Sequence, residues 1–316
     1  MTSLISSISY ARLSAPDLGA MQDFLEAFGL VKEHRDEHRL YMRGTGPAPF
    51  LHVTEKGPAG TLGYGYNVVD DSVLSQLAAH ADASGIEHPD EPGGGRRVTL
   101  IDPNGLHVEL IAGRGSVEPL PPRVKLRPPA GASVRLEPAR IRRIAHAVVA
   151  TPRLAETISW FNSTLRLIPT DELYVGTPDN LLGQFSRIDS GETLVDHHVI
   201  FVLRSQNAGS HHLSFEVDDV DDIFVGHDYL KRQNRYEHVR GIGRHALGSQ
   251  LFDYWMSPFE QMHEHWYTTE VMNSQSGFNS HRVDAELGHD HGEKPTPRFV
   301  RHASPFLGRN TQAVTP

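Results

Sequence analysis

The chain has 316 residues, of which 38% are hydrophobic, and its formal net charge at pH 7 is -9. This length exceeds one core of ordinary size, so we expect two domains of roughly 110 to 150 residues. The chain has no basic stripe and no apolar run of about 18 residues, which argues against nucleic acid and membranes as partners and favours a cytoplasmic protein that binds a small molecule. It contains no cysteine, so a metal would need histidine and carboxylate ligands.

The start of the chain predicts a short strand followed by an amphipathic helix. Residues 8–11 form a strand-like run, and apolar residues then recur at helical spacing from 18 to 28. Such a helix presents one apolar face to a sheet. The same order returns in the second half, where residues 144–147 precede a helical pattern from 154 to 165.

Two further segments of the first half also have a match in the second half. Residues 64–71 match 212–219, where a strand ends in acidic residues and a helix follows. Residues 102–109 match 257–264, each with a proline six residues before a glutamate, which predicts a turn between two strands. We therefore expect one strand-helix-strand-strand-strand unit to be used repeatedly.

Composition also predicts the domain boundaries. Residues 1–115 form the first expected domain, and 139–272 form the second. Residues 116–138 are rich in proline and lack periodicity, which indicates an extended linker. Residues 273–316 form a polar tail with scattered prolines, for which we expect either disorder or a role as a lid.

The three matched segments contain potential metal ligands in only one half. The matched positions hold Tyr10, Tyr64 and Glu109 in the first half, and their counterparts in the second half are two histidines and a glutamate. Two imidazoles and one carboxylate on neighbouring strands are the facial ligand set of Fe(II) oxygenases, with open positions for substrate and O₂. The predicted metal ligands are therefore His146, His212 and Glu264.

At these residues the chain resembles the vicinal-oxygen-chelate (glyoxalase/bleomycin-resistance) superfamily, and within it the type I extradiol ring-cleaving dioxygenases such as 2,3-dihydroxybiphenyl and homoprotocatechuate dioxygenases. Residues 210–217 resemble the strand that carries the second ligand, where the second histidine of a pair, here His212, binds the metal. The segment from 243 to 264, with His245 and Tyr254, resembles the closing segment that ends in the carboxylate ligand.

The resemblance implies an α+β fold of two vicinal-oxygen-chelate domains built from repeated βαβββ modules, with the metal site in the barrel of the C-terminal domain. It also implies a homo-oligomer. The chain departs from the family pattern at Glu260, which stands where the turn usually has glycine. Residues 246–250 do not match the polar run of some biphenyl-type enzymes, which leaves the identity of the catechol open.

The resemblance also implies a reaction and a role for each site residue. The substrate would be a small aromatic diol of the catechol type, the cofactor Fe(II), with Mn(II) as an alternative, and the co-substrate O₂. Residues 196–198 resemble the segment with the acid-base histidine, for which we choose His198 over His197. An imidazole with a pKa near 6.5 can take and return a phenolic proton near neutral pH. His245 and Tyr254 would hydrogen-bond the substrate oxygens.

Several neighbouring residues have less specific interpretations. Arg244 is either a partner for a substrate carboxylate or a solvated surface residue. His211, His263 and His265 alternate with predicted ligands along their strands, so we expect them to point away from the metal. The three tryptophans are expected to pack in the core.

Three other functions remain open. A 4-hydroxyphenylpyruvate-type dioxygenase or a glyoxalase-like isomerase would use a similar metal set, although ring cleavage is favoured by His198, His245 and Tyr254. A metal-free binding protein for small molecules is the third alternative. It would leave the three ligands converged without a cation, which costs several kcal/mol.

Overall fold

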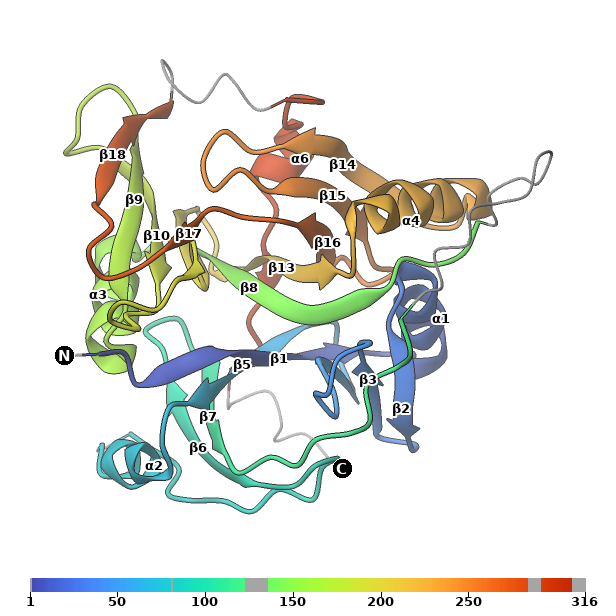
Figure 1. The fold of residues 1–316 in the computed structure, drawn as a ribbon, viewed down its shortest axis with the longest axis horizontal. Coiled ribbons are helices and arrows are strands. Elements are labelled where there is room, and N and C mark those ends of the chain that lie inside the picture. Colours follow the sequence, from blue (N-terminus) through green and yellow to red (C-terminus); the bar gives the residue numbers. More distant parts are fainter. Residues whose placement is uncertain (1, 81, 123–135, 284–290, 309–316) are drawn as a thin grey trace.

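The computed structural model describes residues 2–80, 82–122, 136–283 and 291–308 of the chain. Two mixed sheets face each other, the first drawn in blue and cyan and the second in green to red (Figure 1). Much of the predicted linker lies outside the described residues, and its described ends form no regular structure. No helix among the described residues is long and apolar enough to cross a membrane.

The first sheet has seven strands in the order β2-β3-β4-β1-β5-β7-β6. Two helices accompany it. Its elements are β1 (Ile5–Ala15), α1 (Leu18–Phe28), β2 (Val31–Arg35), β3 (Arg39–Arg43), β4 (His52–Lys56), β5 (Gly60–Val68), α2 (Asp71–Ala78), β6 (Arg96–Ile101) and β7 (His107–Ala112).

The second sheet has ten strands, nine of them in the order β14-β15-β16-β13-β8-β12-β10-β9-β18, with β19 paired to β13. Strands β11 (Val195–Asp196) and β17 (Val271–Met272) form a separate pair. The other elements are β8 (Ile141–Thr151), α3 (Leu154–Leu165), β9 (Ile168–Tyr174), β10 (Leu181–Arg187), β12 (Ile200–Arg204), β13 (Gly209–Val217), α4 (Val220–Gln233), β14 (Glu237–Arg244), β15 (Leu251–Met256), β16 (Met262–Tyr267), β18 (Asn279–Arg282), α6 (Pro297–Val300) and β19 (Ser304–Pro305).

The repeated unit predicted from the sequence is present, with one exception. Units starting at β1, β8 and β13 each have a helix followed by three strands of the main sheet. The unit that starts at β5 has only β6 and β7 after its helix among the described residues, so the expected βαβββ pattern is wrong there. An isolated bridge between Glu87 and Arg97 stands where a further strand would begin.

An aspartate and a glycine set the two ends of helix α1. Asp17 accepts hydrogen bonds from the backbone of Gly19 and Ala20 and so caps the start of α1. Gly29 ends α1 at φ 118, a conformation that favours glycine. A Cβ at Gly29 would lie 2.1 Å from the backbone oxygen of Ala139, so this glycine also allows the second half to pack closely.

The outer face of β16 packs against the first half of the chain. His263 Nε2 lies 3.3 Å from His52 Nε2, and His265 Nε2 donates to the backbone oxygen of Phe28 at 2.6 Å. Gln261 donates to backbone oxygens of Ser14 and Gly60. His263 and His265 therefore face away from Glu264, as the alternation of a strand predicts.

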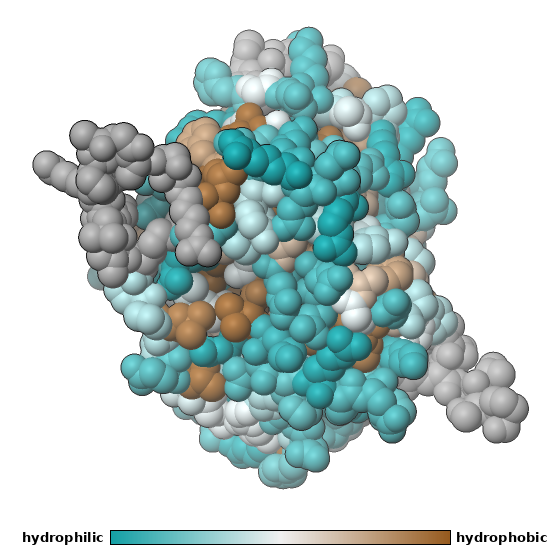
Figure 2. Space-filling model, turned by 90° about the vertical axis from the view of Figure 1, so that its right-hand side faces the viewer, coloured by the Kyte–Doolittle hydropathy of each residue, from teal (hydrophilic) through white to brown (hydrophobic). Residues whose placement is uncertain are grey.

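The described parts of the polar tail run along the second sheet (Figure 1). Strand β18 pairs with β9, β19 pairs with β13, and His291 forms a bridge with Arg244. Residues 279–282 and 304–305 are therefore part of the second sheet, and a role of the tail as a lid stays a prediction. On the molecular face near α1 and α4, most residues are hydrophilic and the hydrophobic ones gather in small separate groups (Figure 2).

Candidate metal centre

Strand register brings the three predicted ligands to one face of the second sheet. Ser214 on β13 pairs with His146 on β8 at one side and with Glu264 on β16 at the other. His212 lies two residues before Ser214 on the same strand and shares its face. The ligand set is thus laid out across three adjacent strands.

The donor atoms of the three side chains face one another. Glu264 Oε2 lies 3.4 Å from His146 Nε2 and 3.5 Å from His212 Nε2. All three ligand atoms lie within 4.8 Å of one another. Ligands at about 2.1 Å from one ion are separated by about 3 to 3.5 Å, so the spacing matches a shared divalent cation.

Glu264 supplies the clearest sign that a cation fits here. Its side chain is 1% exposed, and neither carboxylate oxygen has a hydrogen-bond partner among the described residues. Burial alone would raise the pKa of Glu264, but the facing imidazoles of His146 and His245 lower it well below its usual range. A buried anion without donors needs a positive partner.

The hydrogen bond between His211 and His212 determines which ring nitrogen of His212 carries the proton. His211 Nε2 donates to the backbone oxygen of Phe299 at 2.8 Å, and His211 Nδ1 lies 2.7 Å from His212 Nδ1. Burial lowers the pKa of His211 to about 3 and that of His212 well below 6.5, so both rings are neutral. Since His211 already donates through Nε2, its Nδ1 accepts from His212, and Nε2 of His212 keeps its lone pair for a metal.

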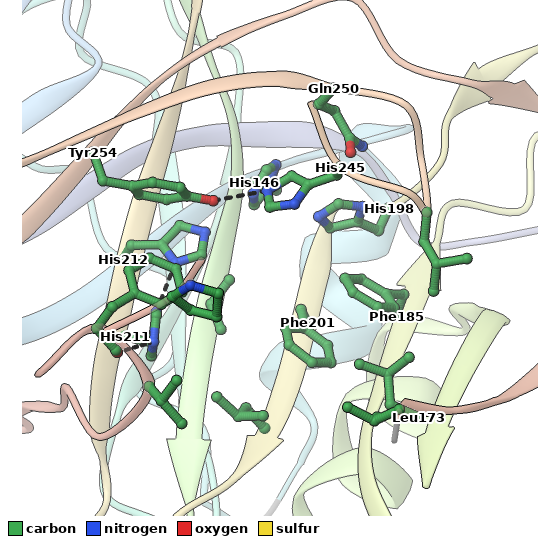
Figure 3. Close-up of a pocket in the computed structure, with 17 residues that line it drawn as sticks. His146, Leu173, Phe185, His198, Phe201, His211, His212, His245, Gln250 and Tyr254 are labelled. Atoms are coloured by element: carbon green, nitrogen blue, oxygen red, sulfur yellow. Dashed lines mark hydrogen bonds between the residues drawn. The ribbon is translucent and has the colours of Figure 1, made fainter. Parts of the chain in front are cut away.

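The expectation that His211 points away from the site is wrong. Its ring lines the same cavity as His212 (Figure 3). Strand β13 has a register shift between Ser210 and His212, which breaks the strict alternation of side chains. His211 therefore supports His212 as a hydrogen-bond partner.

The predicted acid-base histidine also has a buried partner. His198 Nδ1 lies 3.0 Å from His197 Nδ1, and His197 Nε2 donates to Asp171 Oδ2 at 2.7 Å. Asp171 also accepts from His281 on β18 at 3.2 Å. Burial holds the pKa of His198 well below 6.5, and the neighbouring His146 lowers it further. Of the two candidate histidines, His198 lines the cavity and His197 lies behind it.

His245 and Tyr254 lie on the other side of the three ligands. Tyr254 on β15 pairs with Glu264 on β16, and its side chain is 1% exposed. The Tyr254 hydroxyl lies 2.9 Å from His245 Nε2, which is 3.8 Å from Glu264 Oε1. The two side chains form a hydrogen-bonded pair beside the candidate metal position.

A cavity of about 270 Å³ opens onto these side chains. In Figure 3 the rings of His146, His198, His212, His245 and Tyr254 gather at one end, with Phe185, Phe201 and Leu173 at the other. Phe299 and Val300 of the tail complete the wall. The cavity therefore joins a polar, metal-ligating end to an apolar end.

The first half holds an arginine in the corresponding place. Gly65 pairs with Tyr10 and Glu109 as Ser214 pairs with His146 and Glu264. By this register Gly63, and not Tyr64, corresponds to His212, so the predicted match is off by one residue. Tyr64 packs in the hydrophobic core instead.

Arg12 neutralises the buried carboxylate there. Its Nε donates to Glu109 Oε1 at 2.8 Å, and Tyr10 donates to the other carboxylate oxygen. Burial would raise the pKa of Glu109, yet Arg12 and Arg97 lower it to about 2. A protein cation thus occupies the place that a metal would take in the second half.

Among the described residues, one further group brings three potential ligand atoms together, namely His227, His238 and Asp253. Asp253 Oδ1 accepts from His227 at 3.0 Å and from His238 at 2.8 Å, and Oδ2 accepts from Trp255 at 2.6 Å. Both carboxylate oxygens are therefore satisfied, unlike those of Glu264.

The second sheet, with its paired repeats and a histidine-histidine-glutamate set on β8, β13 and β16, defines a protein of the vicinal-oxygen-chelate, or glyoxalase, fold. No family model matches the chain. A curated relative, Metapyrocatechase 2 from Cupriavidus necator, is 27% identical over 265 residues, which covers 81% of this chain and 78% of the relative.

Solved structures agree with this fold. A homoprotocatechuate 2,3-dioxygenase from Brevibacterium fuscum, in an anaerobic complex with 3,4-dihydroxyphenylacetate, superposes with a TM-score of 0.81 at 20% identity and covers 98% of this chain and 95% of its own. The Mn(II)-bound glyoxalase from Novosphingobium aromaticivorans gives a TM-score of 0.79 at 19% identity, with 98% and 99% covered. The predicted fold class and the predicted resemblance to extradiol dioxygenases are confirmed.

Proposed function

We propose that the chain is an extradiol dioxygenase, which opens the ring of a catechol with O₂ at a divalent metal held by His146, His212 and Glu264. The observation that carries this proposal is the buried Glu264 carboxylate, which faces the imidazoles of His146 and His212 and has no hydrogen-bond partner among the described residues. Two histidines and one carboxylate with open positions favour Fe(II), and Mn(II) is the alternative. When bound, the metal would bring the catechol and O₂ together and allow electrons to pass between them.

His198 would take the phenolic proton of the substrate and return it later. Because His197 donates to Asp171, the neutral form of His197 accepts from His198 Nδ1, which leaves Nε2 of His198 without a proton. That nitrogen belongs to a ring that lines the cavity. The side chain is therefore prepared to act as a base.

His245 and Tyr254 would hold the substrate oxygens by hydrogen bonds. They already share a hydrogen bond of 2.9 Å, so a substrate oxygen near them meets preoriented partners. The apolar walls formed by Phe185, Phe201 and Phe299 would limit water around the reacting ring.

The test is metal loading followed by a catechol panel. Anaerobic protein loaded with Fe(II) or Mn(II) is exposed to air with each catechol, and formation of a yellow ring-opened product is followed by absorbance. We expect colour with the wild type and none with His146→Ala. A protein that isomerises a hemithioacetal, or converts 4-hydroxyphenylpyruvate, but opens no catechol would support the metal-dependent alternatives.

The metal-free binding protein makes a different prediction. Its ligand affinity would be unchanged after chelation, and the purified protein would hold no iron or manganese. The ring-cleaving enzyme should instead lose its affinity for catechols when the metal is removed, which calorimetry can measure. A homo-oligomer remains a prediction, which light scattering on the purified protein tests.

A further inference from the structure

The wall of the candidate substrate cavity carries no charged side chain among the described residues. Histidines, Tyr254 and Gln250 surround the ligand end, and the rest is apolar. The apolar lining residues are Val148, Leu173, Phe185, Phe201, Leu203, Leu247, Val283, Pro295, Phe299 and Val300. A substrate group that points away from the metal therefore meets hydrocarbon.

Two arginines of β14, Arg240 and Arg244, are held by other partners. Arg244, for which a substrate carboxylate was one of two interpretations, donates to the backbone oxygen of Ser249 at 2.5 Å and does not line the cavity. Arg240 stacks on the rings of Phe252 and Phe299 and donates to the backbone oxygen of Glu293. Neither arginine lines the cavity.

The tail has cations beside its lining residues, but they are exposed. Arg298 precedes Phe299 and forms ion pairs with Glu237 and Glu260. Arg282, Lys294 and Arg301 are exposed and do not line the cavity. Residues 284–290, which follow Val283 in the sequence, contain no lysine or arginine.

The size of the cavity indicates a substituted ring. Its volume is about 270 Å³, whereas an apolar cavity of about 150 Å³ holds one benzene molecule. Leu173, Phe185 and Phe201 line the end away from the ligands (Figure 3). A catechol with an alkyl chain of a few carbons, or with a small aryl group, would fill it.

We propose that the substrate is a catechol with an uncharged alkyl or aryl substituent, and that catechols with a carboxylate side chain are rejected. This inference rests on the proposed function. A carboxylate in this cavity would lose water and gain no cation, whereas each buried methylene improves binding by about fourfold. The preferred substituent would lack the carboxylate of the 3,4-dihydroxyphenylacetate bound in the structural neighbour from Brevibacterium fuscum.

Two matched pairs of compounds test the inference. One pair is 4-propylcatechol and 3-(3,4-dihydroxyphenyl)propanoate, and the other is the corresponding 3-propyl and 2,3-dihydroxyphenyl compounds. Within a pair, a terminal methyl is replaced by a carboxylate. For the better-cleaved pair, we expect kcat/KM to favour the propyl compound by about 100-fold, and anaerobic calorimetry on the metal-loaded protein to show the same preference in Kd.

A variant tests whether the missing cation causes the preference. Val300 lines the cavity and is 55% exposed, so a lysine there can place its charge at the wall without burial in the core. Val300→Lys should shift the propyl-to-acid ratio of Kd at least tenfold toward the acid, and the uncharged Val300→Gln should shift it less than threefold. Equal shifts in both variants would contradict the electrostatic cause.

Failure of the inference differs from failure of the proposed function. If the acids are cleaved as well as the propyl compounds, the chain is a ring-cleaving enzyme and the inference is wrong. If no catechol is cleaved, the proposed function is wrong, and the Kd values of the matched pairs still decide whether the cavity rejects a carboxylate.

Discussion

Replacement of Asp171 by asparagine should slow catalysis without weakening substrate binding. Asp171 is 4% exposed, and its Oδ2 accepts the hydrogen bond from His197 Nε2 at 2.7 Å. The bond directs the Nδ1 lone pair of His197 toward His198, 3.0 Å away. Asp171→Asn removes the charge from this chain and nearly keeps its shape, so it tests whether the aspartate prepares His198 as a base.

The expected effect follows from the bond that is weakened. A hydrogen bond to a charged group contributes about 1.5 to 3 kcal/mol, and the same loss in the transition state lowers kcat by roughly 10- to 150-fold. Removal of the acid-base group itself, in His198→Ala, should cost roughly 100- to 10,000-fold. Asp171→Asn should therefore be the milder variant, with the dissociation constant for the catechol changed less than threefold.

The assay is steady-state ring cleavage by metal-loaded protein, with Glu172→Gln as the control. Glu172 is the next residue on β9 and accepts from Gln184, and it does not line the cavity. Because Asp171 acts through His198, Asp171→Asn should have no further effect on kcat in the His198→Ala background. A kcat within twofold of the wild type, or two effects that multiply in the double variant, would refute the reasoning.

Three further predictions concern metal binding and stability. Glu264→Gln should lower the metal content at fixed free metal at least tenfold, as measured by elemental analysis. Arg12→Met should lower the free energy of unfolding by about 3 to 5 kcal/mol in urea titrations, because it leaves buried Glu109 short of its closest cation. Burial and the facing His263 hold the pKa of His52 well below 6.5. Just below that pH His52 is therefore protonated in the unfolded chain but not in the folded one. As a result the free energy of unfolding falls as the pH falls. His52→Leu should reduce this slope by up to about 1.4 kcal/mol per pH unit.

The sequence was sufficient to predict that His146, His212 and Glu264 come together, because each sits at a repeated place in a repeated unit; that they bind a metal stays a prediction. His146 occupies the position of Tyr10 near the middle of a long first strand, and Glu264 follows a proline turn as Glu109 does. Strand pairing converts these sequence positions into neighbours across Ser214. The convergence in space therefore required no long-range information beyond the order of the strands.

The details that failed depend on local irregularity. Tyr64 was matched to His212 by the shared Val-Asp-Asp sequence, but this match is one residue out of step with the structure, in which Asp70 caps α2 as Asp219 caps α4. Strand pairing makes Gly63 the counterpart of His212. His211 turns into the cavity because β13 is irregular beside it. Period-two alternation cannot foresee such shifts, because one extra residue reverses the face of every side chain that follows.

The sequence also could not predict hydrogen-bond partners that come from distant segments of the chain. Asp171 on β9 contacts His197, and the backbone of Phe299 contacts His211, across long loops. A hydrogen bond to a backbone oxygen does not depend on residue type, so the sequence cannot indicate it. A single aspartate on a polar strand likewise does not indicate which histidine it contacts. The pair of adjacent histidines, which occurs twice, was the available signal, because the two rings of each pair lie within hydrogen-bond distance of each other through their Nδ1 atoms.

The two halves keep a glutamate at the same strand position and neutralise it in different ways. In the first half Arg12 lies opposite Gly63, where the second half has Val148 opposite His212. An arginine at Val148 would fill the cavity and take the carboxylate from the metal, and a side chain at Gly63 would lie 2.6 Å from the backbone oxygen of His107. The small wall residue Val148 therefore leaves a cavity beside His212 and Glu264 in one half, whereas Arg12 closes the corresponding place in the other half with an ion pair.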